Sequence, residues 1–507
     1  MRYQVAVFLL GMMFLVPSAR AENLQAGTAK VDITSPDATK VHDPCFAKVL
    51  VLRQGENSVV LVTLDAVAIG TIGYVPNDFL PSLRSRLNDE LQVPAGNVLV
   101  NASHCHGHVQ RDLVPAVMQA VHEAWKKIEP VRIGSGSTTE SRISENRRVI
   151  LKDGRQVDMR RAYAFAWDEE IDSTGPIDSQ VGLLRLDRLD GRPLALVYNF
   201  ACHPIMNPPA RGSSADFPGA ASHLLETAFD GEAMAFFIQG CAGDINPVRY
   251  KEVHVFPDAT PLGYFLGVSV LDAIQAIPTD DPQELICSRQ VLELPRATDY
   301  ADRIAALESE REKLVSSLRG TNVNFKTFLA LMLQERLHPD YPSLSKQGYL
   351  HDETIQREDH TLFDAESKAQ VDAYLANIRI MERITRLNTN LALLKKHQRE
   401  TMEAGNSTLE VEVCGLRIGD FKLVTFPGEL TVQVGQNIKA AVKDPTAFVA
   451  GYTNGYIYYT PTVAQRANTG YAQEDCDCLV APSWQLLFET AAVEVLQELN
   501  SAGQESP

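Results

Sequence analysis

Residues 98–110 read "VLVNASHCHGHVQ", so that three histidines, His104, His106 and His108, closely follow an apolar run. The run alternates and contains β-branched residues, a pattern that predicts a buried strand. If the chain stays extended beyond Asn101, His104 and His106 lie on one face and point into the same space. Two such imidazoles offer a metal two neutral nitrogens, or one ligand and one acid–base group. A polar strand end with solvated histidines is the alternative, and this stretch alone leaves both open.

The segments on both sides of this strand alternate between strand and helix patterns. Two apolar segments turn back at Gly55 and at Asp190 and Gly191, which predicts two hairpins. We therefore expect an α/β fold with a layered core of mixed sheets. The predicted elements are a hairpin over 48–69, helices over 79–91 and 114–128, a hairpin over 181–203, a buried strand that begins at 233 and runs into a glycine-containing loop, and a hairpin over 407–430.

Residues from about 300 to 402 differ in character from this core. Residues 300–320 place Ile304 and Leu307 on one helical stripe, and residues 367–398 repeat the same spacing amid charges. We predict two long amphipathic helices, joined by a polar, proline-containing segment and inserted into the α/β core. They either pack against the core alone or also form the roof of a substrate groove.

The first 21 residues have the pattern of a secretory signal peptide. Arg2 precedes an apolar run from Val5 to Val16, and the segment ends in Ala-Arg-Ala. We expect one catalytic unit over residues 22–507, which acts outside the cell or in a periplasm. No later segment has an apolar run long enough for a transmembrane helix.

The charge and the cysteines narrow the possible partners and ligands. The formal net charge of −17 repels phosphate backbones and anionic lipid headgroups, so nucleic acid is excluded as a partner. Eight cysteines allow many disulfide pairings, and the sequence does not choose among them or predict an oligomeric state. Cys105 and Cys202 each adjoin a histidine, which leaves thiolate ligation open beside a packed or disulfide-bonded role.

Other polar residues also stand where apolar runs end, and loops above sheet ends often collect functional groups. His203 ends "LALVYNFACH" and precedes Pro204, and Glu429 follows a Pro-Gly turn in "LVTFPGEL". Residues 451–471 are dense in tyrosine and turn residues. Taken singly, these are a capped strand end, a solvated carboxylate and core tyrosines.

Together, six short blocks resemble the neutral/alkaline (non-lysosomal) ceramidase superfamily and its bacterial members. They occur in the family's order, from the first strands to about residue 475, and exclude the helical insertion. The blocks are "ASHCH" at 102–106, "FACHP" at 200–204, "SADFPG" at 214–219, "QGCAGDINP" at 239–247, "FPGELT" at 426–431, and the tyrosines Tyr459 and Tyr471.

The resemblance implies a metal site with one zinc ion. Its ligands would be His104, His203, Glu429 and Tyr459. Two imidazoles and a carboxylate are usual ligands of catalytic zinc, whereas tyrosine is uncommon and rests on the family pattern alone. Zinc-activated water would then attack an amide carbonyl.

The resemblance also implies catalytic residues beside the metal. His106 would hydrogen-bond the reacting groups or protonate the leaving amine, and Tyr471 would donate to the developing oxyanion. Arg147 in "SENRRVILKDG" would contact the reaction centre, although the adjacent Arg148 fits the pattern as well. His108 receives no role.

Three departures from the family concern the substrate. Asn246 stands where characterised ceramidases have a serine, so the resemblance implies metal-activated water and not a serine ester. The immunoglobulin-like C-terminal domain of ceramidases is expected to be absent, and the helical insertion is additional. These departures leave the metal chemistry intact and weaken ceramide as the substrate.

The leading hypothesis is a secreted zinc amidohydrolase that cleaves an N-acyl linkage in a small molecule or lipid, with ceramide as the best single guess. A zinc hydrolase of the same fold that acts on another amide, an ester or an acylated glycan is the alternative. A non-catalytic binding protein would be expected to lack a ligand or an oxyanion donor. A purely structural zinc usually has ligands close in sequence, whereas these run from His104 to Tyr459.

Overall fold

The computed structural model describes residues 23–501, except 160–165, 208–211, 249, 251–253, 255, 282–283, 344 and 471. The expected signal peptide and Tyr471 therefore lie outside the described residues. Among the described residues, no helix combines the length and apolar character that crossing a membrane requires.

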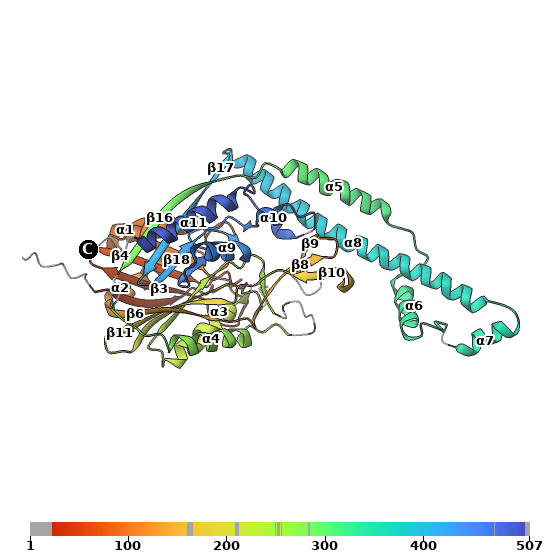
Figure 1. Cartoon of the computed structure of the whole chain (residues 1–507), viewed down its shortest axis with the longest axis horizontal. Helices are drawn as coiled ribbons and strands as arrows, with labels where there is room; N and C mark the ends of the chain where they lie inside the picture. The colour runs from red at the N-terminus through yellow and green to blue at the C-terminus, as the bar shows by residue number, and fades with distance from the viewer. Residues whose placement is uncertain are drawn as a thin grey trace, which may run out of the picture.

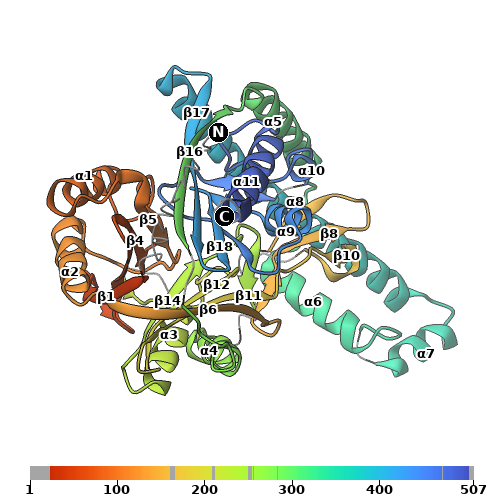
Figure 2. The ribbon, with the colours of Figure 1, turned by 60° about the vertical axis from the view of Figure 1, so that its left-hand side comes forward.

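Two sheets form the centre of the molecule (Figures 1 and 2). The larger sheet has eight strands in the order β14-β12-β11-β6-β1-β3-β4-β5, and the smaller has four in the order β16-β17-β18-β20. Both are mixed, because β4–β5, β12–β14 and β18–β20 are parallel pairs. The strands are β1 (Gln25–Asp32), β3 (Phe46–Gln54), β4 (Asn57–Leu64), β5 (Val98–Ala102), β6 (Glu129–Thr139), β11 (Gln180–Arg188), β12 (Pro193–Phe200), β14 (Met234–Gln239), β16 (Leu285–Pro295), β17 (Thr408–Ile418), β18 (Phe421–Thr425) and β20 (Ala447–Ala450).

Side-chain alternation along the strands builds the layers. On β3, Leu50 and Leu52 belong to the cluster between the two sheets, whereas Val49 and Val51 pack under helices. Both faces of β3 are therefore buried, which explains its nearly continuous apolar sequence. Helices α1 (Phe79–Leu91), α2 (Val114–Lys126), α3 (Asp216–Ala228) and α4 (Thr260–Ile274) cover the larger sheet, and α9 (Val432–Val442) and α11 (Trp484–Ser501) cover the smaller one.

The predicted α/β core with mixed sheets is confirmed. Helix α1 has the predicted bounds, and the first hairpin turns between Gln54 and Asn57, which are paired across β3 and β4. Gly55 in that turn has φ +61°, a left-handed conformation that glycine adopts without strain. The shorter elements are β2 (Lys40–Val41), β7 (Ser144–Asn146), β8 (Arg148–Leu151), β9 (Gln156–Asp158), β10 (Ile171–Thr174), β13 (Gly212–Ser213), β15 (Ile245–Pro247), β19 (Glu429–Leu430), β21 (Tyr459–Thr460) and α10 (Val463–Arg466).

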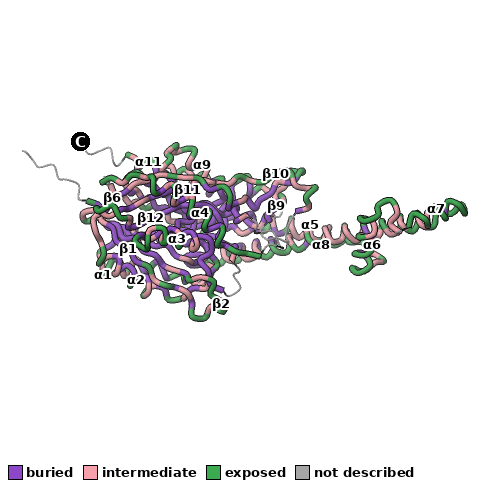
Figure 3. Tube along the Cα trace, turned by 90° about the horizontal axis from the view of Figure 1, so that it is seen from below, coloured by how far each residue is buried: buried purple, intermediate pink, exposed green. Residues whose placement is uncertain are grey.

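The inserted helical segment is also confirmed, and it projects from the body as an arm (Figures 1 and 3). Most of the arm's residues are exposed or half-buried, unlike the purple core of the body in Figure 3. Its helices are α5 (Tyr300–Ser317), α6 (Phe325–Leu337), α7 (Lys346–Thr354) and α8 (Asp359–Ala404).

The segment between the two long helices was predicted as a polar connection, and this is wrong, because it contains α6 and α7. The ring of Phe328 on α6 stacks on Tyr374 of α8 with 4.5 Å between centroids. This contact packs α6 against a distant part of the chain, and such packing stabilises a helix of this length. Helix α8 also begins eight residues earlier than the predicted start at Ser367.

Candidate metal centre and its cavity

Three predicted ligands from distant parts of the chain meet at one point. His104 follows β5, His203 follows β12, and Glu429 begins β19. One ligand atom of each lies within 4.8 Å of the others, and all three side chains are buried. A pair of imidazoles with a carboxylate is a donor set that suits catalytic zinc.

The expectation that His104 and His106 share a strand face is wrong. Strand β5 ends at Ala102, and His104 has φ +69°, so the chain turns where it was expected to stay extended. The backbone N–H groups of Ser103 and His104 donate to Leu64 and Ala66, at 2.9 and 3.0 Å. These bonds hold the turn, and the two imidazoles are still neighbours, with ring centroids 5.6 Å apart.

Backbone carbonyls orient both ligand imidazoles. Nδ1 of His104 lies 2.5 Å from the carbonyl oxygen of Val67, and Nδ1 of His203 lies 3.0 Å from that of Ile245. Because a carbonyl only accepts, each Nδ1 carries the proton and donates it. In the neutral form, Nε2 of each ring is therefore left with a lone pair, which is the arrangement found in metal-bound histidines.

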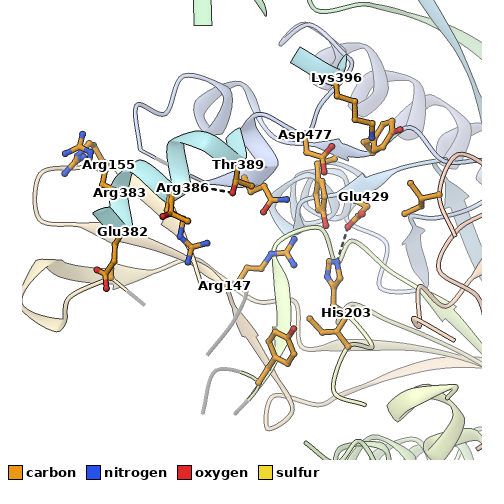
Figure 4. Close-up of a pocket in the computed structure, with 18 of the residues that line it drawn as sticks. Arg147, Arg155, His203, Glu382, Arg383, Arg386, Thr389, Lys396, Glu429 and Asp477 are labelled. Atoms are coloured by element: carbon orange, nitrogen blue, oxygen red, sulfur yellow. Dashed lines mark hydrogen bonds and ion pairs between the residues drawn. The ribbon is translucent and has the colours of Figure 1, made fainter. Parts of the chain in front are cut away.

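Both Nε2 atoms face the carboxylate of Glu429. The distance from His104 Nε2 to Glu429 Oε1 is 3.6 Å. That from His203 Nε2 to Glu429 Oε2 is 3.0 Å, and Figure 4 shows this contact. A lone pair and a carboxylate oxygen repel each other unless a proton or a cation lies between them. The residues present therefore fit a metal cation at this point.

Burial and proximity shift the pKa values of this group. Loss of hydration lowers the pKa of His104 to about 4, against the opposing effect of Glu429. Burial alone would raise the pKa of Glu429, but His104 and His203 outweigh it and hold the pKa below the usual range. Neutral imidazoles and an ionised carboxylate are the forms that bind a metal.

Two tyrosines that were not singled out from the sequence also contact Glu429. The hydroxyl of Tyr452 donates to Glu429 Oε2 at 3.2 Å, and that of Tyr456 donates to Oε1. Both belong to the tyrosine-rich segment, so its composition was the available signal. Tyr459, the tyrosine that was predicted as a ligand, pairs with Glu429 in the parallel β19–β21 ladder and lines the cavity beside the metal group.

The structure distinguishes Arg147 from Arg148. The Arg147 guanidinium lies 5.5 Å from the centre of the Tyr459 ring and lines the cavity. Its Nε donates to Glu474 at 2.7 Å, and its Nη1 donates to Asn246 at 3.2 Å. Arg148 instead forms an ion pair with Asp475 at 2.7 Å and is not part of the cavity wall.

His106 and His108 differ in their surroundings. His106 lies on the cavity wall, where loss of hydration and the neighbouring His104 lower its pKa to about 4. His108 stacks on Tyr74, with ring centroids 4.1 Å apart, and is outside the cavity wall. Of the two, only His106 can reach a molecule in the cavity.

The cysteines do not join the metal group. All eight lie among the described residues, and none of them forms a disulfide bond there. Burial raises the pKa of the Cys105 and Cys202 thiols well above the usual value. In the part of the chain that the structure describes, the side chains whose ligand atoms lie within 4.8 Å of one another are His104, His203 and Glu429, so thiolate ligation by Cys105 or Cys202 is not supported.

The metal group lies in a cavity of about 900 Å³ that extends to the helical arm (Figure 4). One wall comes from the middle of α8, including Arg383, Arg386 and Thr389. The insertion was expected either to pack against the core alone or also to cover a groove. Helix α8 both packs on the core and covers the cavity.

A buried histidine that the sequence analysis missed attaches α8 to the site. His397 Nε2 lies 2.7 Å from Asp477 Oδ1, and Nδ1 lies 3.0 Å from Glu400 Oε2. Asp477 itself lines the cavity. The available signal was a histidine three residues after Leu394, at a position where the helical stripe calls for an apolar side chain.

No family model matches the sequence, and no curated protein matches it. Solved structures do match. The neutral ceramidase from Pseudomonas aeruginosa superposes with a TM-score of 0.58 at 16% identity, over 96% of this chain and 76% of that one. The chain has the neutral ceramidase fold. A ceramidase complexed with C2 matches this fold equally, with a TM-score of 0.59 and 17% identity over 95% of this chain and 76% of that one.

Proposed function

We propose that this protein is a zinc-dependent hydrolase that cleaves an N-acyl amide bond, with ceramide as the best single substrate. The observation that carries the proposal is the buried group of His104, His203 and Glu429 at a cavity in a ceramidase fold. Catalytic zinc sites use such ligands and leave a position open for water or substrate.

The chain's own residues would hold one zinc ion. His104 and His203 would bind through Nε2, since their Nδ1 protons are donated to backbone carbonyls. Glu429 would add a carboxylate oxygen, and Tyr459, its partner across the β19–β21 ladder, is proposed as the fourth ligand. When bound, zinc would lower the pKa of a water molecule and polarise the amide carbonyl.

Three further residues would act on the reacting atoms. His106 is neutral at pH 7, because its pKa is about 4, so one ring nitrogen can accept a proton from water while the other donates toward the leaving amine. Arg147 carries a permanent positive charge beside Tyr459 and would stabilise developing negative charge. Tyr471, which lies outside the described residues, is proposed as the oxyanion donor.

Asn246 supports catalysis by water. Its side chain carries no hydroxyl nucleophile, and its Oδ1 accepts a hydrogen bond from Arg147 at 3.2 Å. The neighbouring Asp244 accepts from the backbone N–H of Val432 at 2.8 Å. Asn246 therefore orients Arg147, and Asp244 holds the loop to the start of α9.

We further propose that residues 1–21 are a signal peptide, so that the mature protein works in an extracellular or periplasmic compartment. The substrate would be a small molecule or lipid. The charge of −17 argues against nucleic acid.

The test uses the purified mature chain, with its metal content measured by elemental analysis. A short-chain fluorescent ceramide, an N-acyl amino acid and simple acyl esters are incubated with and without a chelator. Release of fatty acid from ceramide that stops with chelator and returns with zinc supports reaction and substrate. Turnover of another substrate retains the zinc chemistry and rejects ceramide, and a zinc-loaded protein that is inert on every compound contradicts the proposal.

A second candidate is a hydrolase of the same type that acts on a different amide, an ester or an acylated glycan. The observation in its favour is the wall from α8, which brings several charged side chains into the cavity. Ceramide carries no charge, so this wall suits a different substrate.

A further inference from the structure

The arm side of the cavity is lined by arginines. Helix α8 contributes Arg379, Arg383 and Arg386, whose spacing of four and three residues places them on one face of the helix. Arg155, in the turn between β8 and β9, lines the same cavity (Figure 4). Four guanidinium groups from two elements therefore meet a single space.

The arginines give this wall of the cavity a positive charge, whereas the chain as a whole has a negative net charge. The carboxylates on the same side of the cavity are Glu170 and Glu382. The other two that line the cavity are engaged elsewhere, since Glu429 faces the histidines and Asp477 holds His397. A cationic wall in a chain of net charge −17 concentrates anions at one place.

Ion pairs within the chain account for only part of this wall. Arg379 pairs with Glu169 at 2.7 Å and lies over the Trp167 ring, and Arg383 pairs with Glu310. The half-buried Arg386 has no hydrogen bond or ion pair with any residue that the structure describes, and Figure 4 shows it extending toward Arg147.

Arg155 is paired with Asp153 at 2.7 Å, whereas two donors on α8 are unused. Within the described chain, the Nε atoms of Arg379 and Arg383 are buried and have no hydrogen-bond partner. A buried donor without a partner costs stability, and an oxyanion accepts from these two nitrogens only when the side chain turns them toward the cavity. Guanidinium groups bind phosphate, sulfate and carboxylate through paired hydrogen bonds.

We propose that Arg379, Arg383 and Arg386 form a subsite for an oxyanionic group of the substrate. This inference rests on the proposed function, and it makes the substrate an anionic N-acyl amide whose scissile bond lies at the metal group while its phosphate, sulfate or carboxylate lies under α8. Neutral ceramide leaves the subsite empty.

The first test compares two substrates that differ only in charge, a short-chain fluorescent ceramide and its 1-phosphate. We expect the zinc-loaded wild type to have the higher kcat/KM on the phosphate. Arg386→Gln should raise KM for the phosphate by about tenfold and leave KM for ceramide unchanged. The matched control is Arg399→Gln, because Arg399 is an exposed arginine on the same helix that does not line the cavity.

The second test is independent of turnover. Binding of octyl phosphate and octyl glucoside is measured by calorimetry on the wild type, Arg386→Gln and Arg399→Gln. The subsite is supported if the wild type binds octyl phosphate more tightly than octyl glucoside and if this binding weakens about tenfold in Arg386→Gln but not in Arg399→Gln. This result stands even if the protein hydrolyses no amide. The lack of hydrolysis would contradict only the proposed function. Equal KM and equal binding in all three proteins would overturn the subsite, while chelator-sensitive hydrolysis would still support the proposed function.

Discussion

The body and the arm contribute to one cavity in different ways. The body supplies buried groups from His104 to Glu429, each held by backbone hydrogen bonds or by the sheets. The arm supplies long, half-exposed side chains from one helix face, such as Arg386. Under the proposed function, the buried groups of the body would carry the chemistry and the side chains of the arm would select the substrate. Changes in the body should therefore affect metal binding and kcat, and changes in the arm should affect KM.

The largest effect is expected from His104→Ala. The variant removes one of three buried metal donors, so it should lose the metal and reduce kcat/KM by about 1,000-fold or more. Metal content by elemental analysis and turnover of the best substrate are measured on the same sample. Full activity in a metal-free His104→Ala protein would show that the body does not act through a metal.

His106→Ala should separate catalysis from metal binding. His106 lies on the cavity wall, 5.6 Å from the His104 ring, and is not part of the three-residue metal group. We expect unchanged zinc content and a decrease in kcat of about 100-fold. Loss of zinc from this variant would instead make His106 a ligand.

His397→Ala tests the connection between body and arm. Removal of the imidazole takes away the Asp477 carboxylate's hydrogen bond to α8, whereas Glu400 keeps Tyr458 and Lys396. The free energy of unfolding should fall by about 1–3 kcal/mol, and α8 should be less firmly held at the cavity. We expect KM to rise by about tenfold at constant zinc content. Arg399→Ala on the exposed side of α8 is the control and should change neither value. A pure decrease in kcat would contradict the division between body and arm.

The smallest effect on activity is expected at Glu412, which does not line the cavity. Burial alone would raise the pKa of Glu412, but Arg84 of α1 and Arg289 of β16 lower it to about 2. A depressed carboxylate pKa contributes stability above about pH 4.5 that is lost as pH falls toward 2. At pH 7, Glu412→Gln should therefore lower the free energy of unfolding by about 1–2 kcal/mol. In acid, the free energy of unfolding of this variant should depend less on pH than that of the wild type.

The measurement for Glu412→Gln is urea unfolding between pH 7 and pH 2.5. The kinetic constants of the zinc-loaded variant should match those of the wild type. A change in KM would mean that stability of the body also sets the geometry of the arm.

Local sequence patterns predicted most of the body. The continuous apolar runs of β3 and β4, the turn at Gly55 and the helical spacing of α1 are short-range patterns, which a single segment contains. The short blocks around His104, His203 and Glu429 likewise identified residues that the fold brings together. Helices α6 and α7 escaped prediction, because contacts such as Phe328 on Tyr374 join residues that are far apart in the sequence.

The amino-acid sequence by itself therefore determined the α/β class, the strand patterns of a mixed-sheet core and the short blocks that contain His104, His203 and Glu429. The tertiary structure alone decided that the chain turns at His104, that Arg147 and not Arg148 faces the cavity, and that α8 forms its wall. The physical reason is range: propensity and periodicity act within a few residues, whereas these three outcomes depend on hydrogen bonds, ion pairs and packing between segments separated by up to hundreds of residues.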